Sequence, residues 1–193
     1  NSKDVYIWGK EASVCDSINK IQENKIFLPG NKLSKNLYAI NDIKNKKLFN
    51  SEIYIFAIPT QYLRPILNKI KKDIPKNSIV INASKGIEIK SLKFISQVFE
   101  ELLPGVGKKY VTLSGPSFAK DVASGLPTAV TLSCKKNSIL DKAATLFDNS
   151  NLKVYRSNDI IGVEVSGALK NVIAIGAGLI DGVGQSESTK AAF

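Results

Sequence analysis

Residues 53–84 read IYIFAIPTQYLRPILNKIKKDIPKNSIVINAS, and this stretch decides the fold class. It holds an apolar run that Pro59 ends, a helical pattern over 60–73, and a second apolar run at 78–84. Apolar runs that do not alternate with polar residues are typical of strands buried on both faces. A strand, a helix and another strand in this order predict parallel pairing, because the helix carries the chain back across the sheet.

The same alternation continues in both directions along the chain. We expect further strands at 5–8, 110–115, 127–134 and 152–157, and further helices at 11–24, 91–103, 117–124 and 138–148. Residues 1–157 are therefore predicted to form one α/β domain with a doubly wound parallel sheet. From residue 158 the sequence becomes one long helical pattern that looks built for burial, with Asn158 or Asp159 as its N-cap. We interpret 158–193 as the beginning of an all-helical second domain.

Composition removes several kinds of chemistry. The 193 residues include no histidine, which excludes the usual serine and cysteine hydrolase mechanisms. Cys15 and Cys134 lack metal-ligand spacing, so we expect no metal site and two buried free thiols in a reducing compartment. The longest uncharged apolar run, 171–180, is well short of the roughly 20 residues of a membrane span, so no integral membrane segment is expected.

The net charge of +10 raises the question of a nucleic-acid partner. The lysines lie in short clusters at 41–47, 68–73 and 107–109, mixed with Asn and Asp. A nucleic-acid footprint would instead show one basic stripe with interleaved aromatic residues. We therefore favour solvated surfaces, or attraction of an anionic small molecule, and expect no nucleic acid. A basic nucleic-acid-binding module remains the alternative of a different class, and it predicts steeply salt-dependent binding.

Two lysines follow predicted strands, and ligands of open α/β sheets bind beyond the carboxyl ends of the strands. Lys10 follows the strand at 5–8 and would suit a 2′-phosphate, although Glu11 stands beside it. Lys85 follows the strand at 78–84 and would point into the ligand crevice. For each lysine an ordinary exposed position is an equally good interpretation. The G-x-G-x-x-G turn of a dinucleotide-binding unit is absent from this sequence, and we expect it to be encoded upstream.

The segment SGPSFAKDVASGLPTAV, residues 114–130, follows another predicted strand. Gly115 permits a tight turn from strand to helix, and Ser117 can cap a helix that runs to Gly125. The exposed amides of such a helix would suit an oxygen of a substrate or cofactor. Capping without any ligand is the other interpretation.

Lys170 stands in the middle of an apolar, small-residue stretch. At helical spacing it shares a face with Gly167, Asn171, Ala174 and Gly178. Close helix packing would explain the glycines, but it does not explain a lysine among them. A desolvated lysine loses pKa units and approaches the working range of a general acid or base. Asn171 could hold either the ammonium group or a substrate by a hydrogen bond.

Seven motifs, in their order and spacing, resemble bacterial NAD(P)-dependent glycerol-3-phosphate dehydrogenase over nearly all of 5–193. They are WGK (8–10), FLPG (27–30), IPTQ (58–61), ASKGIE (83–88), LSGPSFAKDVASGLPTAV (113–130), VYRSNDIIGVEVSGALKNVIAIGAGLIDGVG (154–184) and TKAA (189–192). The resemblance implies a cytoplasmic oxidoreductase with a Rossmann-like NAD(P)-binding domain, incomplete at its N-terminus. It also implies reversible reduction of dihydroxyacetone phosphate by NAD(P)H to sn-glycerol 3-phosphate, a precursor of phospholipids.

The resemblance and the residue chemistry give one catalytic residue and six further binding positions. These are catalytic Lys170; cofactor-binding Lys10, Lys85 and Ala119; and substrate-binding Lys85, Gly115, Ser117, Lys170 and Asn171. Lys10 belongs to the adenosine end of the cofactor, where the family commonly has arginine or histidine. A lysine at this position predicts only a slight preference for NADPH over NADH.

Two features of the family are absent from this sequence, the glycine-rich turn and most of the helical domain, which holds the substrate phosphate. We therefore expect a fragment whose own activity is in question. The expected partner is a phosphorylated triose, and a homodimer is left open. The alternative activity is that of a related lysine-dependent hydroxy-acid or ketopantoate-type dehydrogenase.

Overall fold

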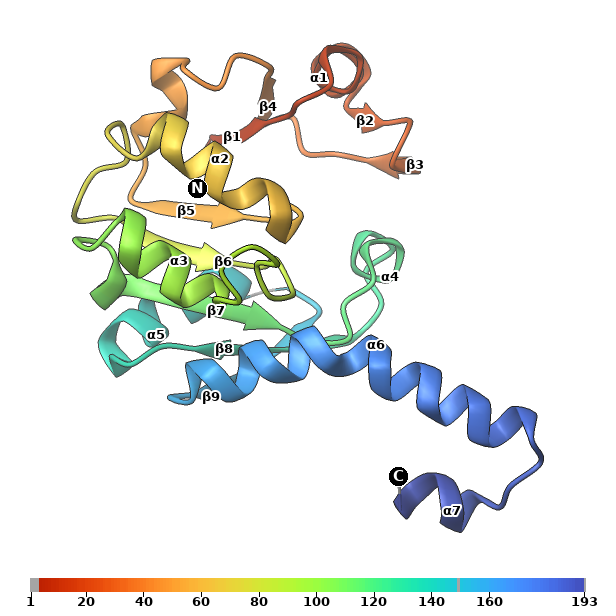
Figure 1. The fold of residues 1–193 in the computed structure, drawn as a ribbon. Helices are drawn as coiled ribbons and strands as arrows, with labels where there is room; N and C mark the ends of the chain where they lie inside the picture. The colour runs from red at the N-terminus through yellow and green to blue at the C-terminus, as the bar shows by residue number, and fades with distance from the viewer. Residues whose placement is uncertain (1–3, 149, 193) are drawn as a thin grey trace.

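The computed structural model describes residues 4–148 and 150–192 (Figure 1). Its central sheet has five strands in the order β5 (Ile53–Phe56), β6 (Ile79–Asn82), β7 (Tyr110–Ser114), β8 (Thr128–Ser133) and β9 (Leu152–Ser157). All four residues of β6 are buried, as expected for an unbroken apolar strand in the middle of a sheet. The strands β5, β6 and β7 run parallel, so their carboxyl ends meet at one edge.

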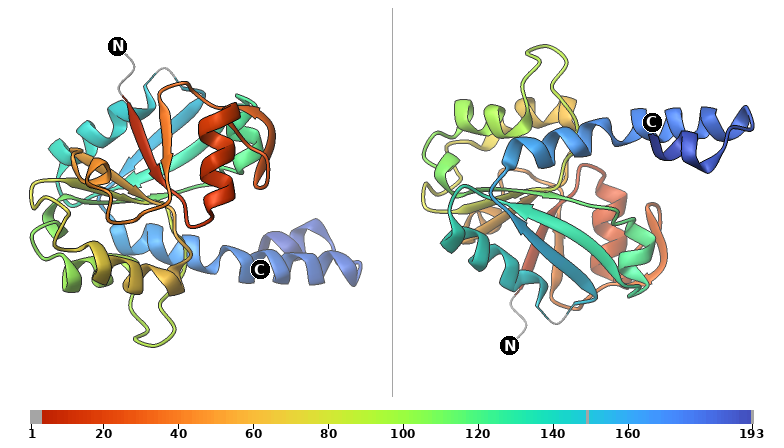
Figure 2. Two further views of the ribbon diagram at one scale, coloured as in Figure 1. Left: turned by 90° about the horizontal axis from the view of Figure 1, so that it is seen from above. Right: turned by 90° about the horizontal axis from the view of Figure 1, so that it is seen from below.

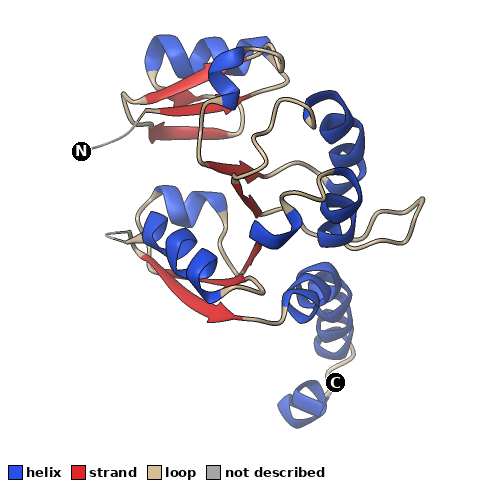
Figure 3. Cartoon of the chain, turned by 90° about the vertical axis from the view of Figure 1, so that its left-hand side faces the viewer, coloured by secondary structure: helices blue, strands red, loops and turns tan. Residues whose placement is uncertain are grey.

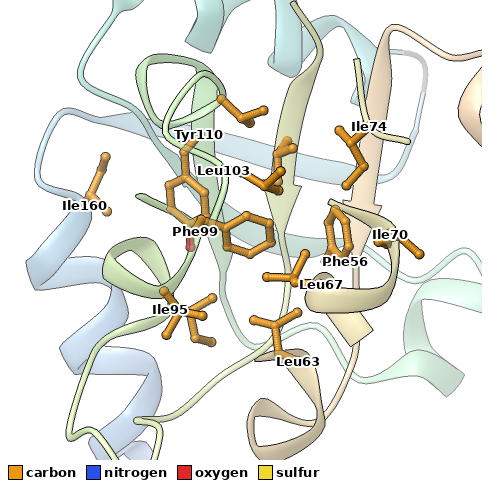
Figure 4. Close-up of a cluster of buried hydrophobic side chains, with 13 residues drawn as sticks. Phe56, Leu63, Leu67, Ile70, Ile74, Ile95, Phe99, Leu103, Tyr110 and Ile160 are labelled. Atoms are coloured by element: carbon orange, nitrogen blue, oxygen red, sulfur yellow. The ribbon is translucent and has the colours of Figure 1, made fainter. Parts of the chain in front are cut away.

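Helices cover both faces of this sheet (Figures 1 and 3). They are α2 (Thr60–Ile70), α3 (Ile95–Leu102) and the first turns of α6 (Ile160–Gly182) on one face, and α5 (Asn137–Ala144) on the other. The face under α2 and α3 holds the larger core, in which Phe99 packs between Phe56 and Tyr110 with ring centroids 5.1 and 5.3 Å apart (Figure 4). The doubly wound, Rossmann-like α/β fold is therefore confirmed.

The first strands form separate small sheets. β1 (Val5–Trp8) pairs in parallel with β4 (Leu37–Ile40), while β2 (Glu23–Asn24) and β3 (Leu28–Lys32) form an antiparallel pair. Helix α1 (Ala12–Ile21) packs on the β1–β4 pair. The strands β2, β3 and β4 were not predicted: β2 and β3 lack an apolar run, whereas β4 has an apolar run as long as that of β1. Within the described residues, β1 pairs with β4 and not with the five-stranded sheet, so the expectation of one continuous sheet was wrong.

The prediction that every strand pairs in parallel was also wrong, because β8 runs antiparallel to β7. The connection between them contains α4 (Ala119–Ala123), which has only five residues. A parallel return requires a crossover that packs on a face of the sheet and carries the chain back to the opposite edge. The segment instead turns back at the carboxyl edge and enters β8 from there. The connection through α5 and the 3₁₀ turn Thr145–Phe147 does pack on a face of the sheet, and β9 is parallel to β8.

Helix α6 is buried only where it crosses the sheet. Ile160, Glu164 and Gly167 are its buried residues, and its second half projects away from the sheet, with α7 (Glu187–Ala192) folded back along it (Figure 2). The expectation of a buried helix was therefore wrong for its second half, whose apolar side chains stay largely exposed although α7 folds back along it. By length and composition α6 could cross a membrane, contrary to the expectation that no segment could. One such helix is weak evidence, and the first turns of this one pack on the sheet.

Candidate active site at the carboxyl edge of the sheet

The turn after β6 places Lys85 at the carboxyl edge, as predicted. The Thr60 hydroxyl, at the beginning of α2, donates to the Lys85 carbonyl at 2.8 Å. Gly86 then adopts a φ of +122°, a conformation that favours glycine. Lys85 Nζ reaches back over the edge and donates to the carbonyl oxygen of Gly115 at 3.0 Å. Two strands, β6 and β7, are therefore bridged by one ammonium group.

Gly115 lies where the chain leaves β7 and passes closely over β8. A Cβ at this position would collide with the carbonyl of Ala129 and lie 2.8 Å from Val130 Cα. Both obstacles are backbone atoms, which cannot move aside as a flexible side chain would. Residue 115 is thus a glycine because of close backbone approach, and its carbonyl is left pointing at Lys85.

Helix α6 approaches the same edge through another glycine. A Cβ on Gly167 would lie 2.9 Å from Ser114 Oγ and 3.7 Å from Lys85 Cγ. The helix begins with Asp159 as N-cap, since its carboxylate accepts from the Gly162 amide at 2.8 Å. The predicted N-cap is therefore confirmed at Asp159, and the helix is fixed at its start and at its crossing point.

Lys170 lies one turn beyond this crossing point, and its ammonium group donates to Asn171 Oδ1 at 2.8 Å. Both residues are exposed, so the expected burial of Lys170 is not observed in the described chain. Partial desolvation, and then the positive charge of Lys170, lower the pKa of Lys85 below its ordinary value. The two ammonium groups therefore share one electrostatic site.

The other predicted residues lie in the segments that follow β1 and β7. Lys10 follows β1, and its ammonium group lies 6.0 Å from the centre of the Tyr62 ring, on the first turn of α2. Sequence analysis did not identify Tyr62. Ser117 does not cap α4, because the helix begins at Ala119 with Phe118 in the cap position. The expectation that Ser117 is an N-cap was therefore wrong. Helix α4 itself contacts β3, on the side of the molecule where β1 also lies (Figure 1).

Sequence analysis also missed Glu164, a buried carboxylate on α6. It lines a cavity of about 10 Å³, the size of one water, together with Lys85, Ser114 and Gly167. The residue spacing could have revealed it, because Glu164 stands at helical spacing between the apolar Ile160 and the small Gly167, on the side that packs against the sheet.

An ion-pair network holds the loop that follows Lys85. Arg64 on α2 donates through Nε to the buried Glu88 carboxylate at 2.8 and 3.0 Å, and through its two terminal nitrogens to Glu101 at 2.7 and 3.0 Å. Lys93 also donates to Glu101, at 2.8 Å, and the Ser91 hydroxyl donates to Glu88. Arg64 lowers the pKa of Glu88 and, with Lys93, lowers that of Glu101 to about 2.

These shifts predict a loss of stability in acid. A carboxylate with a lowered folded-state pKa contributes stability above its ordinary value of 4.5, and this contribution is lost as the pH falls through the folded-state value. We expect the free energy of unfolding, measured by urea titration, to fall over the range from 4.5 towards 2. In Arg64→Gln the free energy of unfolding should fall less steeply over this pH range. Lys20→Gln, in the exposed pair with Asp16, should leave it unchanged. Equal slopes in all three proteins would contradict this account.

The residues present fit a dinucleotide rather than a metal. Within residues 4–148 and 150–192, no group of three His, Cys, Asp or Glu residues could hold a metal ion. Helix α2 begins at the carboxyl edge with no acidic residue in its first turn, so its positive end is available to a phosphate. Lys10 and the exposed ring of Tyr62 lie beside that end.

Comparisons with known proteins agree with this arrangement. A family model described as the N-terminus of NAD-dependent glycerol-3-phosphate dehydrogenase matches residues 1–140, and the model of its C-terminus matches 159–193. The glycerol-3-phosphate dehydrogenase (NAD(P)+) of Bacillus velezensis is 43% identical over 194 aligned positions, covering 100% of this chain and 56% of the relative. The Bacillus subtilis protein of the same name is 41% identical with the same coverage.

Solved structures give the same result. A glycerol-3-phosphate dehydrogenase from Plasmodium falciparum superposes with a TM-score of 0.87 at 30% identity, covering 98% of this chain and 53% of that one. The chain thus spans about half the length of the relatives that it matches. These matches do not favour a ketopantoate-type or other hydroxy-acid dehydrogenase.

Proposed function

Because the chain belongs to the NAD-dependent glycerol-3-phosphate dehydrogenase family, we propose that the protein interconverts dihydroxyacetone phosphate and sn-glycerol 3-phosphate with NAD(P)H. The observation that carries the proposal is the arrangement of two ammonium groups at the carboxyl edge of the sheet. Lys85 is bound to the Gly115 carbonyl, and Lys170 is close enough for its charge to lower the pKa of Lys85. Two cations beside an exposed edge suit a substrate that carries a phosphate and develops negative charge on an oxygen.

The proposed roles follow from this geometry. When bound, the reduced nicotinamide supplies the hydride that reduces the ketone carbon. Lys170 donates a proton to the alkoxide that forms, and Asn171 orients its ammonium group by accepting the 2.8 Å hydrogen bond. Lys85 adds positive potential at the carbonyl from a fixed position. In the reverse direction Lys170 accepts the hydroxyl proton as a general base.

We assign binding to the residues around this pair. Gly115 and Ser117 lie in the turn after β7 and are proposed to contact substrate, while Ala119 at the beginning of α4 is proposed to contact the cofactor. Lys10 is proposed to bind the adenosine end, where its positive charge favours the 2′-phosphate of NADPH over NADH. The named relatives, which use NAD(P)+, support both cofactors.

The remaining proposals concern the whole protein. The two family models support a cofactor domain over 1–157 and a substrate domain that begins at 158, since their matches end at 140 and resume at 159. Two buried free cysteines, Cys15 and Cys134, support a reducing compartment such as the cytoplasm. The product would serve phospholipid synthesis.

A steady-state assay tests the proposed function. We expect the protein, expressed at its full natural length, to oxidise NADPH and NADH when dihydroxyacetone phosphate is added, with the higher kcat/KM for NADPH. Ketopantoate and 3-hydroxyisobutyrate, supplied with the appropriate cofactor, should give no turnover. Activity with ketopantoate alone would transfer the assignment to the alternative dehydrogenase. Salt-sensitive binding of DNA without turnover would favour a nucleic-acid-binding module instead.

A further inference from the structure

A buried carboxylate connects α6 to the body of the sheet. Glu164 is 7% exposed, and its Oε1 accepts from the Tyr110 hydroxyl at 2.7 Å and from the Ser96 amide at 2.9 Å. Its Oε2 accepts from the Ser96 hydroxyl at 2.6 Å. Three donors from β7 and α3 thus hold one side chain of α6, as a buried charge requires. We name Glu164, Tyr110 and Ser96 the anchor cluster.

Tyr110 and Ser96 are both held as hydrogen-bond donors to Glu164. Burial and the Glu164 charge raise the pKa of Tyr110 well above its ordinary value, so the phenol remains a donor. Ser96 lies in the first turn of α3, and its amide is one of those that an α-helix leaves without an internal partner. The carboxylate therefore also lies where the dipole of α3 favours negative charge.

The anchor cluster lies one turn from the site. Glu164, Gly167 and Lys170 follow one another at three-residue spacing, so each is the neighbour of the next on the surface of α6. Gly167 packs on Ser114 and on the aliphatic stem of Lys85, and Glu164 lines the same small cavity as that lysine. Rotation or sliding of α6 at Glu164 would therefore move Lys170 relative to Lys85.

Apolar packing alone would hold α6 less specifically than this carboxylate does. Apolar contacts are not directional, so a helix that rests on them can slide at small cost. Three hydrogen bonds to two oxygens allow one position, and a slip would leave a buried charge without partners. Lys85 is fixed independently, through Gly115 and Thr60. One lysine is thus held by the sheet, and the other by a helix that Glu164 fixes to that sheet.

We propose that Glu164 is a positioning residue, whose hydrogen bonds to Tyr110 and Ser96 set the separation between the ammonium groups of Lys170 and Lys85. Only the expected effect of Glu164 on catalysis rests on the proposed function; its effect on the position of α6 does not. The separation itself can be measured through the effect of one charge on the other. Lys170, from α6, is the charged side chain that acts on Lys85, and Glu164 from the same helix lines the cavity beside it.

The test compares Glu164→Leu with the near-isosteric Glu164→Gln in the full-length protein. Competitive acetylation at a series of pH values, measured peptide by peptide by mass spectrometry, gives the pKa of Lys85 in each variant. We expect Glu164→Leu, which fills the position with an apolar side chain but loses the three directional hydrogen bonds, to raise the pKa of Lys85 towards that of an ordinary lysine. Glu164→Gln keeps an oxygen for Tyr110 and the Ser96 amide, so it should restore the value of the original protein.

The kinetic readout distinguishes positioning from folding. Displacement of a catalytic group by about 1 Å can cost about 100-fold, so kcat of Glu164→Leu should fall by about 10- to 100-fold with KM for the cofactor unchanged. Glu164→Gln should recover most of it. Leu140→Ala, in the core under α5 on the opposite face, is the control for lost stability and should change neither kcat nor the pKa of Lys85.

An unchanged pKa of Lys85 in Glu164→Leu would overturn the proposal, and so would an equal effect of Leu140→Ala. If the original protein does not reduce dihydroxyacetone phosphate, the proposed function fails. The lysine titration still decides whether Glu164 positions α6, because it requires no turnover.

Discussion

Replacement of Lys170 by alanine should lower kcat of the full-length protein by about 10²- to 10⁴-fold, the usual contribution of a general acid or base. The proton that Lys170 supplies would then have to come from water, which is neither oriented nor fixed at the site. KM for the cofactor should change little, since its adenosine end is proposed to be held by Lys10 and the start of α2, neither of which belongs to α6. Stopped-flow and steady-state measurements of NADPH oxidation give both parameters.

The fold should not change in this variant. Lys170 is exposed, and its ammonium group bonds to the neighbouring Asn171 rather than to the sheet. Surface substitutions of this kind usually alter the free energy of unfolding by less than about 0.5 kcal/mol. Lys190→Ala, which removes a half-buried lysine of α7 bound to Asp181 at the far end of α6, is the control. Turnover of Lys170→Ala near the original rate would exclude this lysine as the proton donor.

The sequence predicted the elements of the central sheet well because their physical pattern is local. The run at 53–58 and the run at 78–84 became β5 and β6, and the strand at 152–157 has the predicted bounds. The N-cap at Asp159 was also predictable, since capping depends on one side chain and the amides next to it.

Pairing partners and burial were less predictable, because they depend on residues far apart in the sequence. The direction of β8 follows from how the short α4 turns back, and no apolar pattern within β8 reports it. Glu164 appears in the sequence as one acid in an apolar helix, and only the fold reveals Tyr110 and Ser96 as its partners. Conversely, the apolar second half of α6 predicted burial that the described residues do not provide.

Lys85→Met should lower kcat by about 10²- to 10³-fold, the cost of removing one fixed group that stabilises a developing oxyanion. Methionine retains an aliphatic stem of similar shape against Gly167, so the packing of α6 on this side is kept. The hydrogen bond to the Gly115 carbonyl and the positive charge are lost together. Lys90→Met, an exposed lysine in the same loop, should keep the original rate. If both variants are equally active, Lys85 does not act on the reacting carbonyl.

The pH profile separates the charge of Lys85 from its shape. Desolvation and the charge of Lys170 lower the pKa of Lys85, so its ammonium group loses the proton at a lower pH than an ordinary lysine does. The rate should therefore decline as the pH rises through that lowered value. Arginine stays protonated throughout this range, so Lys85→Arg should move the decline to higher pH even where its maximal rate is reduced. A decline at the same pH in both proteins would mean that a different group loses the proton.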